Sequence, residues 1–195
     1  TIFQAVSAAL DVDLCFYFRL GDAPGTLQLA GSMGVNEADR QRYRVIAFGE
    51  YLCGTVAARR ERLIVEHLAQ SDSPEAAALC AAGVRTYAGF PLLVDGRLLG
   101  TLAFATTRRD CLREGELRVL QSVADQVAAT LERGRLAEEL GQREQRMQQA
   151  LRVSRSFTFD WEPHSDRVRR SASCADILHL HGDAAVTDTG QRFFQ

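Results

Sequence analysis

The stretch from Val84 to Thr107, VRTYAGFPLLVDGRLLGTLAFATT, decides the fold of this chain. Two apolar runs flank Asp95-Gly96 within it. An Asp-Gly pair between such runs is the strongest short-range signal for a β-hairpin, because a type I′ turn needs a positive φ at both central residues. A two-residue loop then predicts the cross-strand pairs Val94–Arg97, Leu93–Leu98 and Leu92–Leu99.

This register predicts which side chains share a face of the sheet. One face carries Leu93, Leu98, Leu102 and Phe104, and the other carries Phe90, Leu92, Leu99 and Ala103. Because both faces are apolar, we expect the hairpin to be the buried centre of a sheet that is covered on both sides. Pro91 is expected at a strand start or a bulge, since it has no N–H to donate. Gly100, predicted opposite it, indicates a close approach of two backbones.

Composition limits the possible classes of protein. The chain has 195 residues, is 46% hydrophobic and carries a net charge of −2, which indicates a globular protein with one full domain and a remainder. The near-neutral charge argues against a nucleic-acid partner, which usually requires a basic stripe. No apolar run reaches the roughly 18 residues that a membrane span needs, and no signal peptide is visible. We therefore expect a cytoplasmic protein, cut from a longer chain.

Reactive and metal-binding patterns are weak. The five cysteines form no CxxC pair, which favours reduced, mostly buried thiols over a zinc site: Cys15, Cys53, Cys80, Cys111 and Cys174. His179 and His181, with His164 upstream, give a poor metal pattern, because residues i and i+2 do not share a helix face. No metal site is predicted. No catalytic motif of the hydrolase, nucleotide or zinc-protease kinds occurs, so no catalytic residue is predicted.

The segments before the hairpin alternate between helices and strands. Helical spacing of apolar residues predicts an opening helix through Leu10, and Asn36 is the expected N-cap of a short helix through Tyr43. Ser73-Pro74 is a typical helix start, and Gly83 is the expected left-handed cap at its end. Further predicted elements are strands at 14–20, 26–30 and 63–65 and a short helix within 49–60.

A long helix is predicted from Leu112 to Arg152. Its first part has a wide apolar stripe, and its second part has only a narrow seam of the coiled-coil kind. A helix this long and polar cannot bury itself against one small domain, so we expect a parallel homodimer. The predicted seam residues are Leu131, Leu136, Leu140, Met147 and Leu151.

The order of these elements resembles that of a GAF domain, the small-molecule-sensing module of signalling proteins. The resemblance covers residues 1–132 and rests on these matches: Leu52–Ala57, Arg62–Val65, Gly83–Arg85, Pro91–Gly96, Leu99–Leu102 and Leu120–Ala129. It implies an α+β fold in which an antiparallel sheet carries helices on both faces. It also implies a pocket on one face of the sheet, roofed by the segments from Phe48 to Gly83.

The tail resembles the start of a PAS domain. The resemblance rests on Phe159-Asp160-Trp161, on Asp166-Arg167-Val168 and on Ile177-Leu178, although His179 stands where such domains place a glycine. The alternating apolar residues of this tail predict two strands, and Ser173 is the expected cap of a short helix. The expected division is a GAF-like domain at 1–132, a coiled-coil signalling helix at 133–153 and a truncated PAS-like part at 154–195.

The resemblance implies a set of pocket-lining residues: Phe16, Phe18, Phe48, Leu52, Val65, His67, Leu79, Arg85, Tyr87 and Phe90. His67 could bind a ligand or titrate near neutral pH, and the simpler interpretation is a surface or core histidine. Arg85 and Tyr87 could hold an anion, against the simpler interpretation of a solvated strand edge. No cofactor is predicted, and an unknown small molecule is the expected ligand.

The predicted function is a sensory input module of a bacterial signal-transduction protein. The layout of GAF domain, helix and PAS domain implies a two-component sensor histidine kinase with its phosphorelay downstream, and less often a diguanylate cyclase. One alternative is a dimerisation spacer without a ligand. Another is a small thiol redox enzyme that uses Cys53 or Cys80, because a helix N-terminus can lower a thiol pKa.

Overall fold

The computed structural model describes residues 7, 9–154, 156–171, 173–178 and 187–189. The chain divides into two compact units, residues 1–133 and residues 134–195. Each unit is described here by itself. The expected division into three parts stays a prediction, as does the opening helix, whose residues Ile2, Phe3 and Val6 lie outside the described part of the chain.

A six-stranded antiparallel sheet forms the centre of the first unit, with the strand order β3-β2-β1-β6-β5-β4. The long hairpin of β5 and β6 stands within this sheet, between β1 and β4. This arrangement confirms the α+β class and the central place of the hairpin. The strands are β1 Leu14–Leu20, β2 Thr26–Met33, β3 Val45–Ala47, β4 Leu63–Val65, β5 Thr86–Val94 and β6 Arg97–Thr106.

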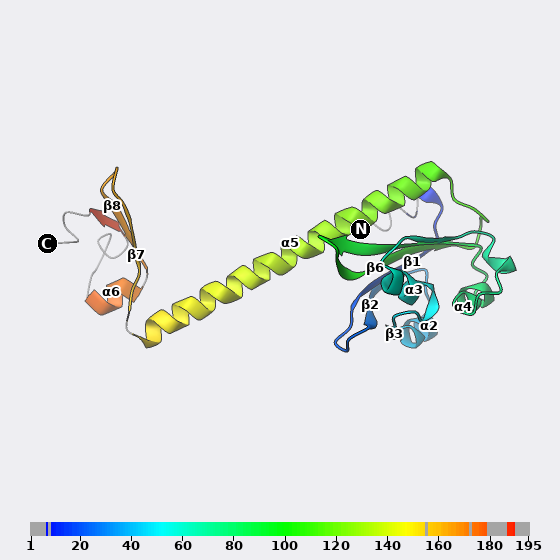
Figure 1. The fold of residues 1–195 in the computed structure, drawn as a ribbon, viewed down its shortest axis with the longest axis horizontal. Helices are drawn as coiled ribbons and strands as arrows, with labels where there is room; N and C mark the ends of the chain where they lie inside the picture. The colour runs from blue at the N-terminus through cyan, green and yellow to red at the C-terminus, as the bar shows by residue number, and fades with distance from the viewer. Residues whose placement is uncertain (1–6, 8, 155, 172, 179–186, 190–195) are drawn as a thin grey trace. The chain divides into compact units, whose positions relative to one another are not determined.

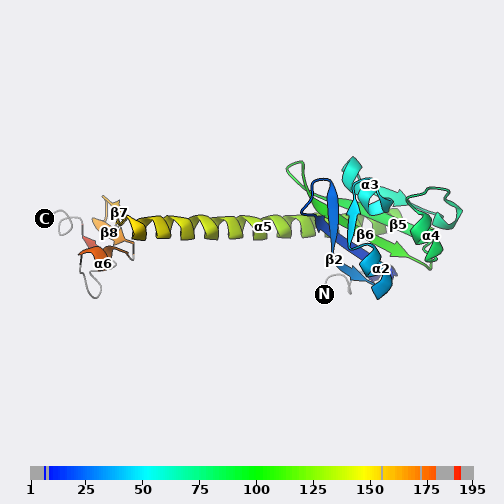
Figure 2. The same cartoon turned by 90° about the horizontal axis from the view of Figure 1, so that it is seen from below.

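Helices cover both faces of this sheet (Figures 1 and 2). On one face lie the short elements, which are α2 Glu37–Arg42, α3 Tyr51–Arg59, η1 Leu68–Gln70 and α4 Ala77–Ala81. The first part of α5, Glu114–Val153, covers the other face with Leu117, Leu120 and Ala124. Each face therefore has its own apolar core, and the sheet separates the two.

The hairpin turn has the predicted geometry. Asp95 has a φ of 49° and Gly96 a φ of 75°, as a type I′ turn requires. The pairs Val94–Arg97 and Leu93–Leu98 are confirmed, but Leu92 pairs with Gly100 because the register shifts between Leu92 and Leu93. The predicted pair of Leu92 with Leu99 is therefore wrong by one residue.

This β-bulge changes which side chains share a face, because a shift of one residue reverses the alternation along a strand. Leu98 and Ala103 lie in the core beside α3, whereas Phe90, Leu92 and Leu102 lie together in the core beside α5. The predicted grouping of Leu98 with Leu102 is wrong. Both faces are apolar all the same, so the prediction of a sheet covered on two sides holds.

Gly100 marks the predicted close approach of two backbones. A Cβ atom added there would lie 2.0 Å from the carbonyl oxygen of Phe18, on the neighbouring strand β1. Pro91 pairs with Thr101 rather than with Gly100, and it lies next to the bulge. The changed partner of Pro91 follows from the register shift between β5 and β6.

Two helix boundaries test the capping predictions. The Asn36 side chain accepts a hydrogen bond from the Asp39 N–H at 2.8 Å, which confirms the predicted N-cap of α2. The start predicted at Ser73 is wrong, because α4 begins at Ala77 and the Ser73 hydroxyl donates to the Glu75 carboxylate instead. Gly83 has a φ of 78° and ends α4 as predicted.

The second unit contains the end of α5 and a small three-stranded sheet with the order β7-β8-β9. Its elements are β7 Phe159–Glu162, β8 Arg167–Arg170, α6 Ser173–Leu178 and β9 Thr187–Thr189. The predicted hairpin of the tail is present. The PAS resemblance of this unit stays a prediction. Among the described residues, no helix is both long and apolar enough to span a bilayer.

Candidate functional site

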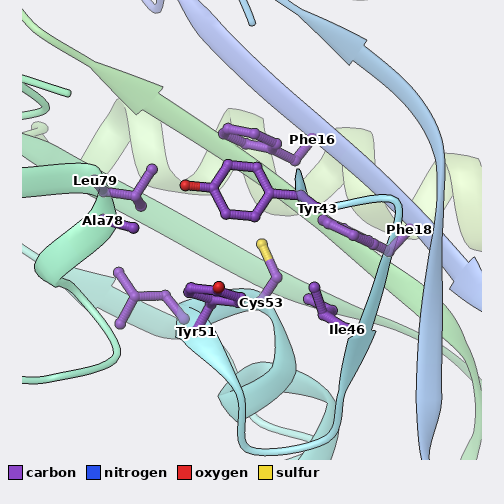
Figure 3. Close-up of a pocket in the computed structure, with 9 residues that line it drawn as sticks. Phe16, Phe18, Tyr43, Ile46, Tyr51, Cys53, Ala78 and Leu79 are labelled. Carbon is purple, nitrogen blue, oxygen red and sulfur yellow. The ribbon is translucent and has the colours of Figure 1, made fainter. Parts of the chain in front are cut away.

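An aromatic pocket lies between strand β1 and the short helices of the first unit (Figure 3). Its volume is about 30 Å³, which is room for a few water molecules at most. Pockets for small ligands usually measure roughly 300–1,000 Å³, so the pocket is closed by its own side chains. The lining residues are Phe16, Phe18, Tyr43, Ile46, Tyr51, Leu52, Cys53, Ala78 and Leu79.

Two tyrosines close this pocket. The ring centroids of Tyr43 and Tyr51 lie 5.2 Å apart, edge to face, and Phe16 contacts Tyr43 at 6.3 Å in the same way. The Arg42 guanidinium lies 5.8 Å from the centroid of the Tyr43 ring. Tyr51 has a φ of 54°, a left-handed backbone conformation that is uncommon for a bulky residue. Such strain often occurs at ligand sites.

A larger cleft opens beside this pocket and shares Phe16, Tyr43 and Leu79 with it. Its volume is about 370 Å³, which falls within the range of ligand sites. We call the two spaces the inner pocket and the outer cleft. The residues that line only the outer cleft are Asp13, Leu14, Gly34, Val35, Asn36, Asp39, Ala82, Val84 and Thr107.

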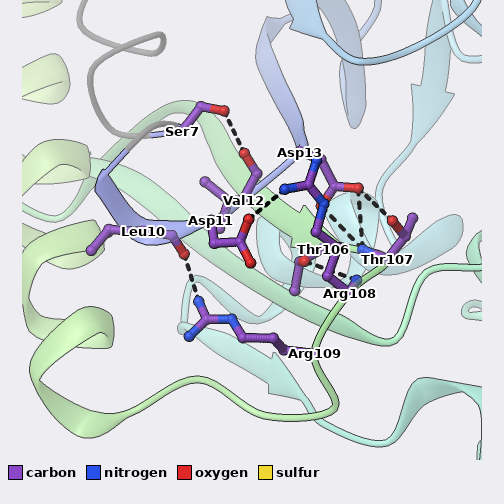
Figure 4. A network of polar contacts seen from close by, with 9 residues as sticks. All are labelled: Ser7, Leu10, Asp11, Val12, Asp13, Thr106, Thr107, Arg108 and Arg109. Atoms are coloured by element: carbon purple, nitrogen blue, oxygen red, sulfur yellow. Dashed lines mark hydrogen bonds and ion pairs between the residues drawn. The ribbon is translucent and has the colours of Figure 1, made fainter.

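Polar contacts tie the wall of the outer cleft to the end of β6 (Figure 4). The Asp13 carboxylate accepts hydrogen bonds from the Thr107 N–H at 3.1 Å and from the Thr107 hydroxyl at 2.5 Å. Burial raises the pKa of Asp13, but the hydrogen bonds from Thr107 and Thr106 outweigh it and hold the pKa below its ordinary value. Asp13 is therefore ionised at neutral pH.

The same segment continues to α5. Arg109 donates to the carbonyl oxygen of Leu10 at 2.5 Å and pairs with the Glu116 carboxylate, in the first turn of α5, at 2.9 Å. Arg108 pairs with Asp11 at 2.6 Å. The wall of the cleft and the start of α5 are thus joined through residues 106–116 of the chain.

The thiol of Cys53 faces the inner pocket from α3 (Figure 3). The Tyr87 hydroxyl donates a hydrogen bond to its sulfur at 3.3 Å. Burial raises the pKa of the Cys53 thiol to about 12, because the interior disfavours the thiolate. Burial also raises the pKa of Cys15 to about 12. Neither thiol has the lowered pKa that a redox nucleophile needs.

The predicted pocket residues divide into four groups, of which three belong to the two apolar cores. Phe16, Phe18, Leu52 and Leu79 line the inner pocket together. Tyr87, Phe48 and Val65 belong to the same core without lining the pocket. Phe90 lies in the core on the opposite face of the sheet, so its placement in this pocket is wrong. The cause is the alternation of side chains along β5, which sends Tyr87 and Phe90 to different faces.

His67 and Arg85 lie at another place, beside Asp110. Arg85 forms two hydrogen bonds of 2.7 Å with the Asp110 carboxylate, and the backbone N–H of His67 donates to the backbone carbonyl of Asp110 at 2.9 Å. Asp110 already pairs with Arg85, and Tyr87 is fully buried. Arg85 and Tyr87 therefore do not form a joint anion site. His67 and Arg85 are both solvent-exposed, outside the inner pocket.

Sequence reasoning missed five lining residues: Tyr43, Ile46, Tyr51, Cys53 and Ala78. Tyr43 ends α2, Ile46 lies in β3, Tyr51 and Cys53 lie in the first turn of α3, and Ala78 lies in α4. An alternation of aromatic and charged residues, in Arg42-Tyr43 and Glu50-Tyr51, was the available signal. It identifies aromatic rings beside charged residues but not the face on which the rings lie.

The predicted seam residues also differ in their surroundings. Leu131 is partly buried and packs against the core beside α5, so its side chain is engaged within its own domain. Leu136, Leu140 and Met147 are exposed. Leu151 is half-buried. The dimer seam itself stays a prediction. Within the described residues, no group of three side chains suits a metal ion, and His179 and His181 lie outside that part.

Comparisons with known proteins identify the class to which this fold and pocket belong. Residues 1–132 match the GAF domain family, so the chain belongs to that family. A comparison with curated proteins gives no match.

Solved structures with the same fold come from several kinds of protein. The GAF domain of an Acinetobacter phosphoenolpyruvate-protein phosphotransferase is 17% identical, with a TM-score of 0.59 over 71% of this chain and 82% of that chain. A domain of a putative two-component sensor histidine kinase from Sinorhizobium meliloti is 21% identical, with a TM-score of 0.56 over 72% and 91%. Free methionine-R-sulfoxide reductase from Neisseria meningitidis is 22% identical, with a TM-score of 0.58 over 69% and 75%. Because all three identities are below 25%, these comparisons show a shared fold alone.

Proposed function

We propose that this chain is the sensory input module of a bacterial signal-transduction protein, in which a small ligand bound by the GAF domain biases a pair of output helices. The parent protein that fits best is a two-component sensor histidine kinase with its phosphorelay. The module acts in the cytoplasm as a homodimer through α5. The domain of the Sinorhizobium protein described above supports this choice among GAF proteins, although a likeness of fold is all that the two share.

One observation carries the proposal. The inner pocket lies on one face of the sheet and α5 lies on the other. Residues 106–116 run from Thr107, which lines the adjoining outer cleft, to the first turn of α5, where Glu116 pairs with Arg109. A ligand that prefers one arrangement of these side chains shifts the balance between two states of α5 by its difference in affinity.

The closed state of the inner pocket defines how a ligand enters. With about 30 Å³ available, a ligand must displace Tyr43 or Tyr51. Movement of the Tyr51 backbone also releases its left-handed φ of 54°. The lining is aromatic and aliphatic apart from the two phenol groups and one thiol. The part of the ligand that enters is therefore apolar and flat, and the side chains of Tyr43 and Tyr51 control its entry.

The experiment that tests this function is native mass spectrometry of the whole chain, followed by a thermal-shift screen of small apolar and aromatic compounds. Extra mass that leaves on denaturation, or a hit that raises Tm, supports the sensor. The hit must lose its effect in Ala78→Val, which fills the pocket, and keep it in the control Ala81→Val, because Ala81 is exposed on the same helix. If the chain carries no extra mass and no compound gives such a hit, the ligand-sensing part of the proposed function is contradicted.

The alternatives predict other outcomes. A dimerisation spacer gives a clean dimer and no ligand, and the input of a diguanylate cyclase behaves as a sensor does but joins a different output. A thiol redox enzyme requires a reactive Cys53 or Cys80. Burial raises the Cys53 pKa, and the Cys80 thiol donates to the Leu68 carbonyl at 2.9 Å, so the structure gives the thiol alternative no support.

A further inference from the structure

The outer cleft has the size of a ligand site and an asymmetric charge. Two carboxylates line it, Asp13 before β1 and Asp39 on α2, and no basic side chain is among its lining residues. Three arginines lie nearby: Arg108 pairs with Asp11 at 2.6 Å, Arg40 approaches Glu37 at 3.7 Å, and the Arg42 guanidinium lies 5.8 Å from the centroid of the Tyr43 ring. The lining of the cleft itself carries two negative charges and no positive one, which favours a cation.

Both carboxylates are positioned by short contacts. Thr107 holds Asp13 through its N–H and its hydroxyl, and the Asn36 amide donates to the Asp39 carboxylate at 2.8 Å. An ionised carboxylate offers about four acceptor positions, so Asp39, which accepts from Asn36, retains more acceptor capacity than Asp13, which Thr107 contacts at both oxygens. Neither carboxylate forms an ion pair among the contacts described for this part of the chain.

The remaining wall of the cleft is apolar and leads to the inner pocket. Leu14, Val84 and Leu79 line it, and the Tyr43 ring is shared with the inner pocket. An ammonium group held by the carboxylates can thus extend an apolar stem along this wall toward Tyr43.

We propose that the outer cleft binds a small organic cation, a primary alkyl- or arylammonium, with its charge at Asp13 and Asp39 and its stem against Tyr43 and Leu79. This assignment rests on the proposed function, since it names the class of ligand that the sensor reads. Binding engages Asp13, whose carboxylate is bonded to Thr107, and so acts on the segment that Arg109 ties to Glu116 of α5.

The test compares three probes of similar size on the full chain: 2-phenylethylammonium, neutral 2-phenylethanol and anionic 3-phenylpropionate. Isothermal titration calorimetry gives affinity, and backbone amide shifts of Asn36 and Thr107 give location. The ammonium is expected to bind at least tenfold more tightly than the other two. Asp13→Asn and Asp39→Asn should each weaken it by about tenfold, because each removes a charge-assisted hydrogen bond. Asp22→Asn, in an exposed turn, is the matched control.

Each result decides the question. The assignment of an organic cation is overturned if no binding of 2-phenylethylammonium is detected at concentrations up to about 10 mM, which would mean an affinity at least ten times weaker than that of a millimolar ligand. It is also overturned if phenylpropionate binds equally well, or if both variants bind as tightly as Asp22→Asn. Should phenylethanol alone bind, with shifts around Tyr51 that Ala78→Val abolishes, the cation class fails while the sensor function stands. Asp39 is half-buried on α2, and Asp39→Asn leaves the contact of Asp13 with Thr107 unchanged, so its result does not depend on the fold surviving the Asp13 change.

Discussion

The reactivity of single residues in this domain depends on their surroundings as well as on the type of side chain. Cys53 stands in the first turn of α3, where a helix N-terminus can lower a thiol pKa. Its side chain is buried, however, and burial raises the pKa to about 12. The Tyr87 hydroxyl donates to its sulfur, so the pair acts as a satisfied part of the core.

A thiol-labelling experiment measures this difference. Iodoacetamide at pH 7.5 should modify Cys111, which is exposed, at least a hundredfold faster than Cys53, because a pKa of about 12 leaves very little thiolate. Peptide mapping by mass spectrometry gives the two rates. Labelling of Cys53 at the rate of Cys111 in the folded chain contradicts the burial argument and revives the thiol alternative. Labelling in denaturant, where the two rates should converge, is the control.

Asp13 gives a pH dependence at the same scale. Its folded pKa lies below its ordinary value of 3.8 because the hydrogen bonds from Thr107 and Thr106 outweigh the effect of burial. The lowered pKa contributes stability that is present above the unfolded pKa and lost as pH falls through the folded pKa. In urea titrations, Asp13→Asn should therefore lose part of the fall in unfolding free energy below about pH 4. An unchanged acid limb, with Asp22→Asn as the control, contradicts this prediction.

The strands of the sheet are held in place by close contacts with their neighbours, and Gly100 lies at one of the closest. Gly100→Ala places a Cβ 2.0 Å from the Phe18 carbonyl oxygen on β1, so the strands must separate. We expect a loss of about 2–4 kcal/mol in the free energy of unfolding, measured by urea titration. Gly31→Ala on β2 is the matched control, because the nearest atom to its Cβ is Tyr17 Cδ1 at 3.8 Å. Equal effects of the two substitutions contradict the close-approach interpretation.

The bulge between Leu92 and Leu93 is the element-scale feature with the widest effect. It places Leu98 and Leu102 on opposite faces and so assigns side chains to the pocket core or to the α5 core. A bulge leaves no clear signature in sequence, since Pro91 indicates only that a ladder hydrogen bond is missing.

At the scale of the whole molecule, the polar second half of α5 is what links sensing to output in the proposed function. Leu140→Asp should convert a dimer to a monomer, because it places a charge in an apolar seam. Analytical ultracentrifugation of the full chain measures the change. Gln145→Asp adds the same charge on the same helix and should leave the dimer intact. An unchanged mass for Leu140→Asp removes α5 as the dimer contact, whereas a monomeric unmodified chain contradicts the homodimer itself.

The sequence by itself determined the hairpin, the covered sheet, the Asn36 and Gly83 caps and the long helix, because these follow from local turn chemistry and from the period of apolar residues. It also indicated the GAF class through the order of its elements. Only the tertiary structure decided the site. The packing of helices on the two faces of the sheet places Phe90 in the core beside α5, Tyr43 at the end of α2 meets Tyr51 of α3 and closes the pocket, and Thr107 meets Asp13 across 94 residues of sequence. These are contacts between distant segments, and no local pattern specifies them.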